Sequence, residues 1–204
     1  MTLLFIFDMD DVLYDYNWRV RMDGMAELTG LSFTELRARW WNESGEWAAE
    51  AGVYATAEEY LDAHQEALGV SIDVDEWVRL RRLGMTPWPE SIAAVERASE
   101  LGQVTLLTNN GALVSRHLRT LAPELIGVFG DHLHTSSDYF ARKPNPVVFE
   151  RVLEKYGVAA SDAFFADDRP ENVEGAASVG IEAHLFESSA GMLAAIEKFA
   201  AARA

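Results

Sequence analysis

Two aspartates, Asp8 and Asp10, come directly after a short apolar run at residues 3–7. Two carboxylates this close at the end of a buried strand would repel each other, and burying them without partners would be costly. A bound divalent cation would remove this conflict. Because the ligands would be oxygens, with no cysteine or nearby histidine, they favour a hard ion such as Mg²⁺. A second pair, Asp167 and Asp168, ends another apolar run and could complete the coordination.

A purely structural explanation competes with this chemistry. An aspartate after a strand is often only a helix cap or a turn former. For either pair of aspartates alone, the structural explanation and a metal site have about equal probability. It weakens for both pairs together, because Lys143 and Thr108 also stand in loops next to predicted strands and helices. We therefore interpret the four aspartates as parts of one site.

The overall charge limits the partners of such a site. The chain of 204 residues has 17 Lys and Arg against 33 Asp and Glu, a net charge of −16. Nucleic-acid backbones and anionic membranes would be repelled, so we expect neither as a partner. If the substrate is itself anionic, the site must supply positive charge locally, from a cation, a lysine or helix N-terminal amides.

The chain contains no cysteine, which excludes disulfides, thiolate catalysis and cysteine-based zinc sites. The apolar start at residues 1–7 lacks a basic region and a small-residue cleavage site, so we do not expect a signal peptide. No apolar run approaches the roughly 20 residues that span a bilayer. We expect a cytoplasmic protein with one core domain and a modest insertion.

Short apolar runs alternate with helical patterns over most of the chain. Strands buried on both faces are predicted at residues 3–7, 104–107, 163–166 and 183–186, with a weaker one at 131–135. Helices are predicted at residues 89–101, 112–121 and 146–156. This alternation indicates an α/β fold, a Rossmann-like parallel sheet core flanked by helices with right-handed crossovers.

The polar signals fall at the carboxyl ends of the predicted strands. Asp8 and Asp10 end one strand, Thr108 and Asn109 a second, and Asp167 with Asp168 a third. Open parallel sheets bind their ligands at this edge. We expect these side chains to converge there.

Residues 16–85 break the alternation and contain no convincing strand. Amphipathic helices are predicted near residues 19–29, 32–41, 56–68 and 74–82, and the second and third begin with the spacing of a capping box, at Ser32 and Thr56. We interpret this stretch as a small all-helical cap domain of residues 16–85. The core domain then comprises residues 1–15 and 86–204.

The chain resembles the haloacid dehalogenase superfamily in four motifs that occur in the family's order along the whole chain. They are Asp8-Met9-Asp10-Asp11-Val12, Leu107-Thr108-Asn109, Arg142-Lys143-Pro144-Asn145-Pro146, and Phe165-Ala166-Asp167-Asp168-Arg169-Pro170-Glu171-Asn172. The helical insertion after the first motif resembles the cap of one branch of that superfamily, in which the details are most similar to small sugar-phosphate phosphatases. One departure is Asn145, where the family often has an aspartate; we expect a difference in loop packing rather than loss of activity.

The resemblance implies a role for each aspartate of the first motif. Asp8 would attack phosphorus and become an aspartyl-phosphate. Asp10 would protonate the leaving alkoxide, then take a proton from the attacking water, and its backbone carbonyl would bind Mg²⁺. Family members that act as dehalogenases lack a carboxylate at the position of Asp10, which disfavours dehalogenation here.

The other motifs would handle the phosphate and the metal. The resemblance implies that Thr108 and Asn109 bind the phosphoryl oxygens and that Lys143 neutralises charge on Asp8 and the phosphoryl group. Asp168 would bind the metal directly and Asp167 through water, although the order of these two stays open. Asp8 and the Asp10 carbonyl would complete the metal site.

The cap would decide which substrate is accepted. Trp47 and Tyr14 are our candidate substrate contacts, because aromatic faces beside polar residues suit a small polar ring. The alternative is that the tryptophans of this region simply form the cap's own core. We expect five arginines to lie on solvated helix faces: Arg19, Arg21, Arg79, Arg81 and Arg82.

The sequence thus favours a magnesium-dependent phosphatase that hydrolyses a small phosphorylated metabolite, possibly a sugar phosphate. Three alternatives stay open: a phosphomutase of the same fold, a 2-haloacid dehalogenase, and a non-catalytic binding protein. The sequence does not indicate the oligomeric state.

Overall fold

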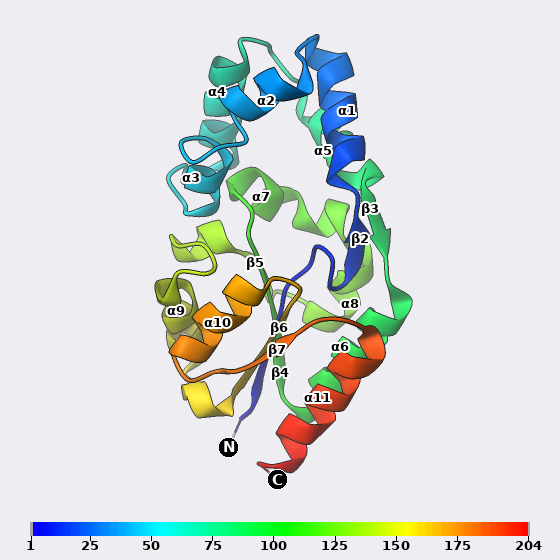
Figure 1. Cartoon of the computed structure of the whole chain (residues 1–204), viewed down its shortest axis with the longest axis vertical. Helices are drawn as coiled ribbons and strands as arrows, with labels where there is room; N and C mark the ends of the chain where they lie inside the picture. The colour runs from blue at the N-terminus through cyan, green and yellow to red at the C-terminus, as the bar shows by residue number, and fades with distance from the viewer. Residues whose placement is uncertain (1, 204) are drawn as a thin grey trace.

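A five-stranded parallel sheet forms the centre of the computed structural model, which describes residues 2–203 (Figure 1). The strand order is β5-β4-β1-β6-β7. The strands are β1 (Leu4–Phe7), β4 (Gln103–Thr108), β5 (Leu133–Thr135), β6 (Ala163–Asp167) and β7 (Glu182–Leu185). The predicted α/β fold with a Rossmann-like parallel sheet is confirmed, and the weaker strand predicted at residues 131–135 forms as β5.

The central strand β1 has apolar side chains on both faces because helices cover both sides of the sheet. Phe5 and Phe7 pack in one buried cluster, whereas Leu4 and Ile6 pack in another on the opposite face. The first face is covered by α6 (Pro89–Leu101), α7 (Ala112–Leu121), α8 (Ile126–Phe129) and α11 (Ser189–Ala201), and the second by α9 (Pro146–Tyr156) and α10 (Pro170–Ser178). This burial explains why the strand reads as a continuous apolar run.

The register of the sheet fixes where the strands end. Phe7 of β1 pairs with Leu106 of β4 on one side and with Ala166 of β6 on the other. The backbone N–H of Asp8 then donates to the carbonyl of Ala166 at 3.0 Å. The residues that follow β1, β4 and β6 therefore meet at one edge of the sheet, as expected for parallel strands.

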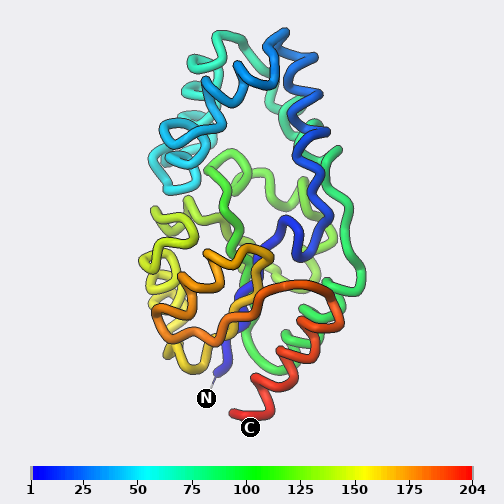
Figure 2. The backbone as a smooth tube through the Cα atoms, in the orientation of Figure 1, coloured from blue at the N-terminus to red at the C-terminus, as the bar shows by residue number. Residues whose placement is uncertain are grey.

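Five helices lie beyond that edge, between two short strands that pair antiparallel. The strands are β2 (Tyr14–Tyr16) and β3 (Met85–Pro87), and the helices are α1 (Trp18–Thr29), α2 (Phe33–Arg39), α3 (Glu46–Glu50), α4 (Ala57–Leu68) and α5 (Val74–Leu83). Figure 2 shows the chain leaving and re-entering the sheet region side by side through these two strands. Helix α3 and the two-stranded ribbon were not expected, because segments of three to five residues are too short to show a period.

The helical insertion has an aromatic core of its own. Trp40 packs edge-on against Tyr60 and His64, at ring-centroid distances of 5.2 and 5.0 Å, and Trp77 packs against Tyr60 at 6.0 Å. All four side chains are buried. Burial lowers the pKa of His64 to about 3, so this imidazole is neutral at physiological pH. Trp40 is thus a core residue of the insertion, as the structural alternative predicts.

The predicted helix starts in the insertion are largely confirmed. Ser32 and Glu35 form a full capping box, with the Ser32 hydroxyl accepting from the Glu35 N–H and the Glu35 carboxylate accepting from the Ser32 N–H. Thr56 accepts from the Glu59 N–H, but the Glu59 carboxylate accepts from the N–H of Ala55 instead.

The remaining elements are three short 3₁₀ turns, η1 (Pro123–Leu125), η2 (Ser136–Tyr139) and η3 (Ala160–Asp162). Between residues 2 and 203, no helix combines the length and the apolar character that crossing a bilayer requires.

Candidate active site

A buried lysine joins two of the predicted aspartates. Lys143 lies in the loop before α9, and its ammonium Nζ is 2.9 Å from Oδ1 of Asp8 and 2.6 Å from Oδ2 of Asp167. The side chains of Lys143 and Asp167 are fully buried, and that of Asp8 is nearly so. Three residues from distant parts of the chain therefore meet where β1 and β6 end, as predicted.

The charges of this group are unevenly matched. Burial alone would lower the pKa of Lys143, but the carboxylates of Asp167 and Asp8 outweigh it and raise that pKa. Burial raises the pKa of Asp8 well above its ordinary range, and the attraction of Lys143 offsets this only in part. Lys143 therefore stays protonated, and its single charge is not enough to keep both Asp8 and Asp167 ionised without a further cation.

Asp168 adds a third carboxylate to the group. Oxygens of Asp8, Asp167 and Asp168 lie within 4.8 Å of one another. Burial, followed by repulsion from Asp167, raises the pKa of Asp168 to about 6. Oxygen ligands with surplus negative charge are what a hard divalent cation requires. These residues therefore fit Mg²⁺.

Asp167 is the more fully bonded of the neighbouring pair. Besides Lys143, its carboxylate accepts from the Asn172 side-chain amide at 2.9 and 3.0 Å and from the Arg169 backbone N–H at 2.9 Å. Asn172 belongs to α10, the helix that follows β6. Asn172 has no role that its sequence position predicts, because its contact with Asp167 forms only when the helix packs over the strand end.

Asn109 holds the backbone of Lys143 in place. Its amide Nδ2 donates to the Lys143 carbonyl at 2.9 Å, and its Oδ1 accepts from the Lys143 N–H at 2.9 Å. Thr108 is buried next to it, and its hydroxyl accepts from the Asn110 side chain at 2.9 Å. Both predicted phosphate-binding residues thus lie at the carboxyl end of β4, beside the lysine. Asn145 caps α9 by accepting from the Val147 N–H, which agrees with the expected loop-packing role.

Asp10 contributes no carboxylate to the three-aspartate group within residues 2–203 and points instead toward the insertion. Its Oδ2 lies 2.6 Å from Nη2 of Arg81, a residue of α5 whose side chain is only 1 % exposed. The Arg81 guanidinium also stacks 3.6 Å from the centre of the Tyr16 ring.

The expectation that Arg81 and Arg21 face solvent is wrong, since both side chains are buried. The helical pattern of α5 does not show that a carboxylate 71 residues away will meet it. Arg19 and Arg79 are exposed as expected, and Arg82 is half-buried beside Glu124.

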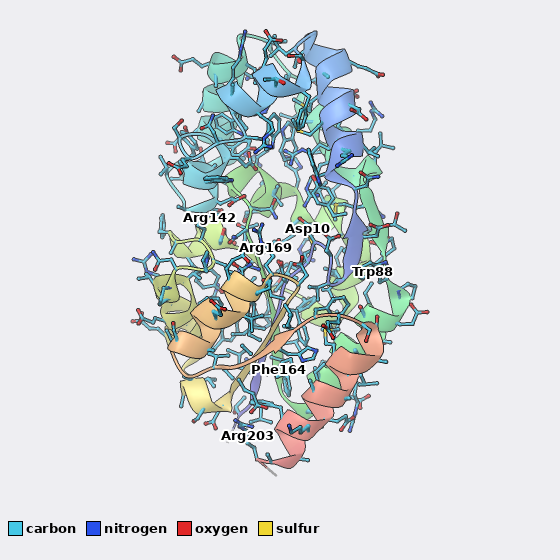
Figure 3. All side chains as sticks on the ribbon, viewed as in Figure 1. Asp10, Trp88, Arg142, Phe164, Arg169 and Arg203 are labelled. Atoms are coloured by element: carbon cyan, nitrogen blue, oxygen red, sulfur yellow. The ribbon has the colours of Figure 1, made fainter. Side chains whose placement is uncertain are left out.

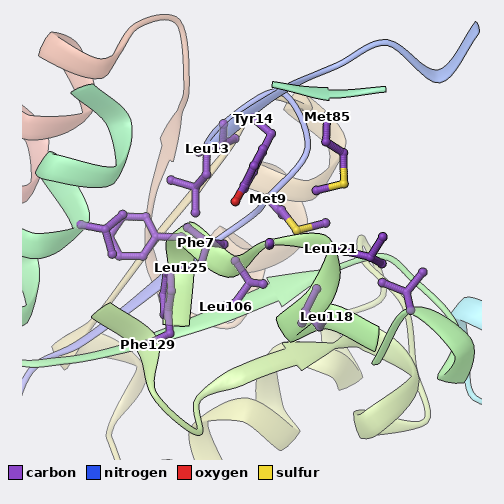
Figure 4. Close-up of a cluster of buried hydrophobic side chains, with 14 of the residues drawn as sticks. Phe7, Met9, Leu13, Tyr14, Met85, Leu106, Leu118, Leu121, Leu125 and Phe129 are labelled. Carbon is purple, nitrogen blue, oxygen red and sulfur yellow. The ribbon is translucent and has the colours of Figure 1, made fainter. Parts of the chain in front are cut away.

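Tyr14 does not lie where a substrate contact must lie, which corrects our prediction. Figure 4 shows it among the apolar side chains of Met9, Leu13 and Met85. It is fully buried, and its hydroxyl donates to Glu124 at 2.6 Å. Tyr14 and Tyr16 share one face of β2, with Asp15 exposed between them, but only Tyr16 lines the cavity described next.

A cavity of about 380 Å³ separates the insertion from the sheet edge. The core contributes Asp10, Asn109 and Arg169 to its wall, and the insertion contributes Trp47 among others. Figure 3 shows Asp10, Arg142 and Arg169 between the α1–α5 helices and the sheet. The Trp47 ring is 42 % exposed and lies under the Arg142 guanidinium at 5.6 Å. Trp47 is thus placed beside the cavity, and its contact with substrate stays a prediction.

Direct contacts hold the insertion against the sheet edge. Arg142 Nε is 2.6 Å from the Glu50 carboxylate, and the Ser136 hydroxyl donates to the Glu50 carbonyl at 2.7 Å. Gly111 makes this approach possible, since a Cβ there would lie 2.9 Å from the Tyr60 ring. The cavity is therefore covered by the insertion in this structure.

The fold and the site together define a class: an α/β enzyme with a lysine-centred carboxylate site at the strand ends, under a helical insertion. The family model for haloacid dehalogenase-like hydrolases matches residues 2–180, and the chain belongs to this family. The match confirms the resemblance recognised in the four motifs, and with it that the protein is a hydrolase.

Known relatives are similar over most of the chain. Phosphatase MT3486 of Mycobacterium tuberculosis is 29 % identical over 189 residues, which cover 90 % of this chain and 87 % of that protein. The HAD family enzyme BT-2542 of Bacteroides thetaiotaomicron, solved with magnesium and inorganic phosphate, has the same fold, with a TM-score of 0.73 at 19 % identity over 91 % of this chain and 94 % of that one. A 2-haloacid dehalogenase from Pseudomonas syringae gives a TM-score of 0.63 at 21 % identity, with both chains covered in full.

Proposed function

We propose that this hydrolase is a magnesium-dependent phosphatase that cleaves a small phosphomonoester through an aspartyl-phosphate on Asp8. The observation that carries the proposal is the ion pair of Asp8 with the buried Lys143, inside a group of three carboxylates suited to Mg²⁺. A carboxylate nucleophile tolerates an anionic substrate only if nearby cations cancel the charge. The similarity to Phosphatase MT3486 supports the same conclusion.

In the first step, a carboxylate oxygen of Asp8 attacks phosphorus in line with the ester oxygen. The new Asp8–phosphorus bond forms as the bond from phosphorus to the leaving oxygen breaks, and Asp10 gives that oxygen a proton. In the second step, Asp10 takes a proton from water, which attacks phosphorus and frees Asp8 and inorganic phosphate. Lys143 balances the charge of Asp8 and of the phosphoryl group throughout.

The environment of Asp10 suits an acid and base. Its Oδ2 is held by Arg81, whereas its Oδ1 is buried without a hydrogen-bond partner among residues 2–203. Asp10 also lines the cavity, where a leaving group would lie. One oxygen thus anchors the side chain while the other is available for proton transfer.

Asp8, Asp168 and the Asp10 carbonyl would hold Mg²⁺, with Asp167 acting through water because its oxygens already bond Lys143 and Asn172. The ion supplies charge stabilisation for the phosphoryl oxygens when bound. Thr108 and Asn109 would hold the phosphoryl group from the end of β4.

We further propose that residues 16–85 act as a cap domain that selects the substrate. This insertion supplies most of the cavity wall that faces the predicted phosphate site. Covering the site excludes bulk water from the reaction. Trp47 lines the cavity whereas Tyr14 does not, which supports Trp47 as an aromatic contact of the leaving group.

The proposal is tested by assaying a generic aryl phosphate with Mg²⁺ and with a chelator. We expect turnover only with the metal. A 2-haloacid is expected to release no halide, because Asp10 carries a carboxylate. Halide release without phosphate release would favour the dehalogenase alternative, and conversion of a hexose phosphate to its isomer would favour the phosphomutase.

Asp10→Asn is expected to trap the covalent intermediate. Asparagine cannot take the proton from water, so hydrolysis of the aspartyl-phosphate should slow by about 10²–10⁴-fold. An aryl phosphate, whose leaving group needs little protonation, should still phosphorylate Asp8. Intact-mass spectrometry after rapid quenching should show one added phosphoryl group. Steady turnover at the wild-type rate would contradict the role of Asp10.

Tyr14→Phe and Trp47→Ala separate a core residue from a cavity residue. Tyr14→Phe removes a buried hydrogen bond to Glu124 and should lower the free energy of unfolding by about 1 kcal/mol. Its relative kcat/KM values over a panel of phosphomonoesters should not change. Trp47→Ala should change that ranking with little loss of stability. The opposite pattern would return Tyr14 to the substrate site.

A further inference from the structure

We propose that the leaving group of the substrate carries a second anionic group, a carboxylate or a second phosphate, which binds Arg21 and Arg81. This inference rests on the proposed phosphatase function and adds the substrate class. Both arginines line the cavity between the insertion and the sheet edge. They come from α1 and α5, and so lie on the side away from the predicted phosphate site.

Arg21 is a buried cation with two nitrogens that have no acceptor in the described part of the chain. Arg21 is only 5 % exposed. Neither its Nε nor its Nη2 has a hydrogen-bond partner among residues 2–203. The guanidinium lies near the rings of Trp41 and Trp77, at 5.4 and 4.6 Å from their centres. Aromatic faces hold the charge in position but do not bond its N–H groups, so these donors are left without a hydrogen-bond partner.

The guanidinium of Arg81 has partners for only part of its hydrogen-bond donors. Its Nη2 bonds Asp10, but Nε and Nη1 are buried with no partner within the described chain. Leaving charged donors buried and unbonded costs free energy, so two such residues in one cavity need an explanation. A carboxylate or phosphate in the cavity would accept from both guanidinium groups, and charge-assisted bonds of this kind are stronger than those to a neutral hydroxyl.

Asp10 contacts Arg81 through one oxygen, but the other two carboxylates of the cavity wall are bonded to other partners. Glu46 accepts from Trp40 and Tyr60, and Glu50 is bonded to Arg142. Arg37 and Arg169 add further positive charge to the same wall. Four arginines and three carboxylates line this wall, so in a chain of net charge −16 the cavity is a local exception with a small positive excess that favours an anion.

The geometry also limits the size of the substrate. Arg81 touches Asp10, the proposed proton donor to the leaving oxygen, so the second anionic group must lie only a few bonds from that oxygen. A volume of about 380 Å³ is near the lower end of the usual range of ligand pockets, roughly 300–1,000 Å³. A compact phosphorylated hydroxy acid or a small bisphosphate meets both conditions.

The test compares three esters of equal chain length with Mg²⁺ present. They are the phosphate of a three-carbon hydroxy acid, the bisphosphate of a three-carbon diol, and the monophosphate of the same diol. The first two esters have an anionic leaving group, and we call them the anionic esters; the third has an uncharged leaving group, and we call it the neutral ester. We expect kcat/KM of the wild-type protein to be about 10- to 100-fold higher for at least one anionic ester than for the neutral ester, which is the range that charged hydrogen bonds give. The better of the two anionic esters identifies the carboxylate or the phosphate as the group recognised.

Arg21→Met tests the assignment to one side chain, because methionine keeps much of the apolar stem between the tryptophans. It should remove about 10- to 100-fold of kcat/KM for the preferred anionic ester and change the neutral ester less than about threefold. Arg21→Lys should restore part of the loss. Arg19→Met, an exposed arginine on the same helix, is the matched control and should change neither value.

Each outcome decides the inference. Equal wild-type kcat/KM for all three esters, or an equal loss for all of them in a folded Arg21→Met protein, would overturn it while leaving the phosphatase intact. If Arg21→Met does not fold, the wild-type comparison still decides. If the wild-type protein hydrolyses neither these esters nor an aryl phosphate, the proposed function itself fails, and the inference fails with it.

Discussion

Asp8→Asn is expected to lower the magnesium-dependent kcat for an aryl phosphate by about 10⁴-fold or more, the scale of losing a catalytic nucleophile. The amide of asparagine has nearly the shape of the carboxylate but cannot form the acyl phosphate. Lys143 keeps its shorter contact, 2.6 Å to Asp167, so the fold of the site should survive. The variant should therefore unfold at a temperature close to that of the wild-type protein.

The measurement is a steady-state assay together with a test for covalent labelling. Asp8→Asn should gain no phosphoryl group by mass spectrometry, whereas Asp10→Asn should. Asp15→Asn, at an exposed aspartate of the same segment, is the control and should keep wild-type activity. Turnover retained in Asp8→Asn would rule out the aspartyl-phosphate mechanism. Because the substitution removes one negative charge from the proposed metal site, we also expect Mg²⁺ to bind more weakly.

Lys143→Met is expected to lower both the stability of the protein and its activity. Removing the lysine leaves the buried carboxylates of Asp8 and Asp167 without their shared cation. Losing one partner of a buried ion pair typically costs about 3–5 kcal/mol. The phosphoryl group would lose a neutralising charge at the same time, so kcat should fall by about 10³-fold, as for other preorganised electrostatic contacts.

Denaturant unfolding with a chelator and with excess Mg²⁺ separates these effects. A divalent ion bound only to the folded state adds about 2.7 kcal/mol at one hundred times its dissociation constant. We therefore expect Mg²⁺ to restore part of the stability of Lys143→Met but not its activity. Lys198→Met, an exposed lysine on α11, should change neither. Unchanged stability of Lys143→Met without metal would show that the buried ion group is not what stabilises the strand ends.

Predictions that depended on local pattern were confirmed. Residues 4–7 are apolar on both faces because helices cover both sides of the sheet, and this condition is visible in the sequence as a run. Parallel strands bring their carboxyl ends to one edge, so Asp8, Asn109 and Asp167 could be placed together before their distances were known. The sequence alone therefore determined the fold class and the clustering of these residues around Lys143.

Only the tertiary structure decided which side chains of the insertion face the cavity. Arg81 meets Asp10 across 71 residues, and Tyr14 meets Glu124 across 110. A helical period shows which residues share a face, but not what that face will touch. The sequence therefore predicted that Arg21 and Arg81 face solvent and that Tyr14 contacts the substrate. The packing of the helices shows instead that all three side chains are buried. The sequence motifs at the strand ends determine the residues of the predicted phosphate end of the site, whereas the other end depends on how five helices pack against the sheet edge.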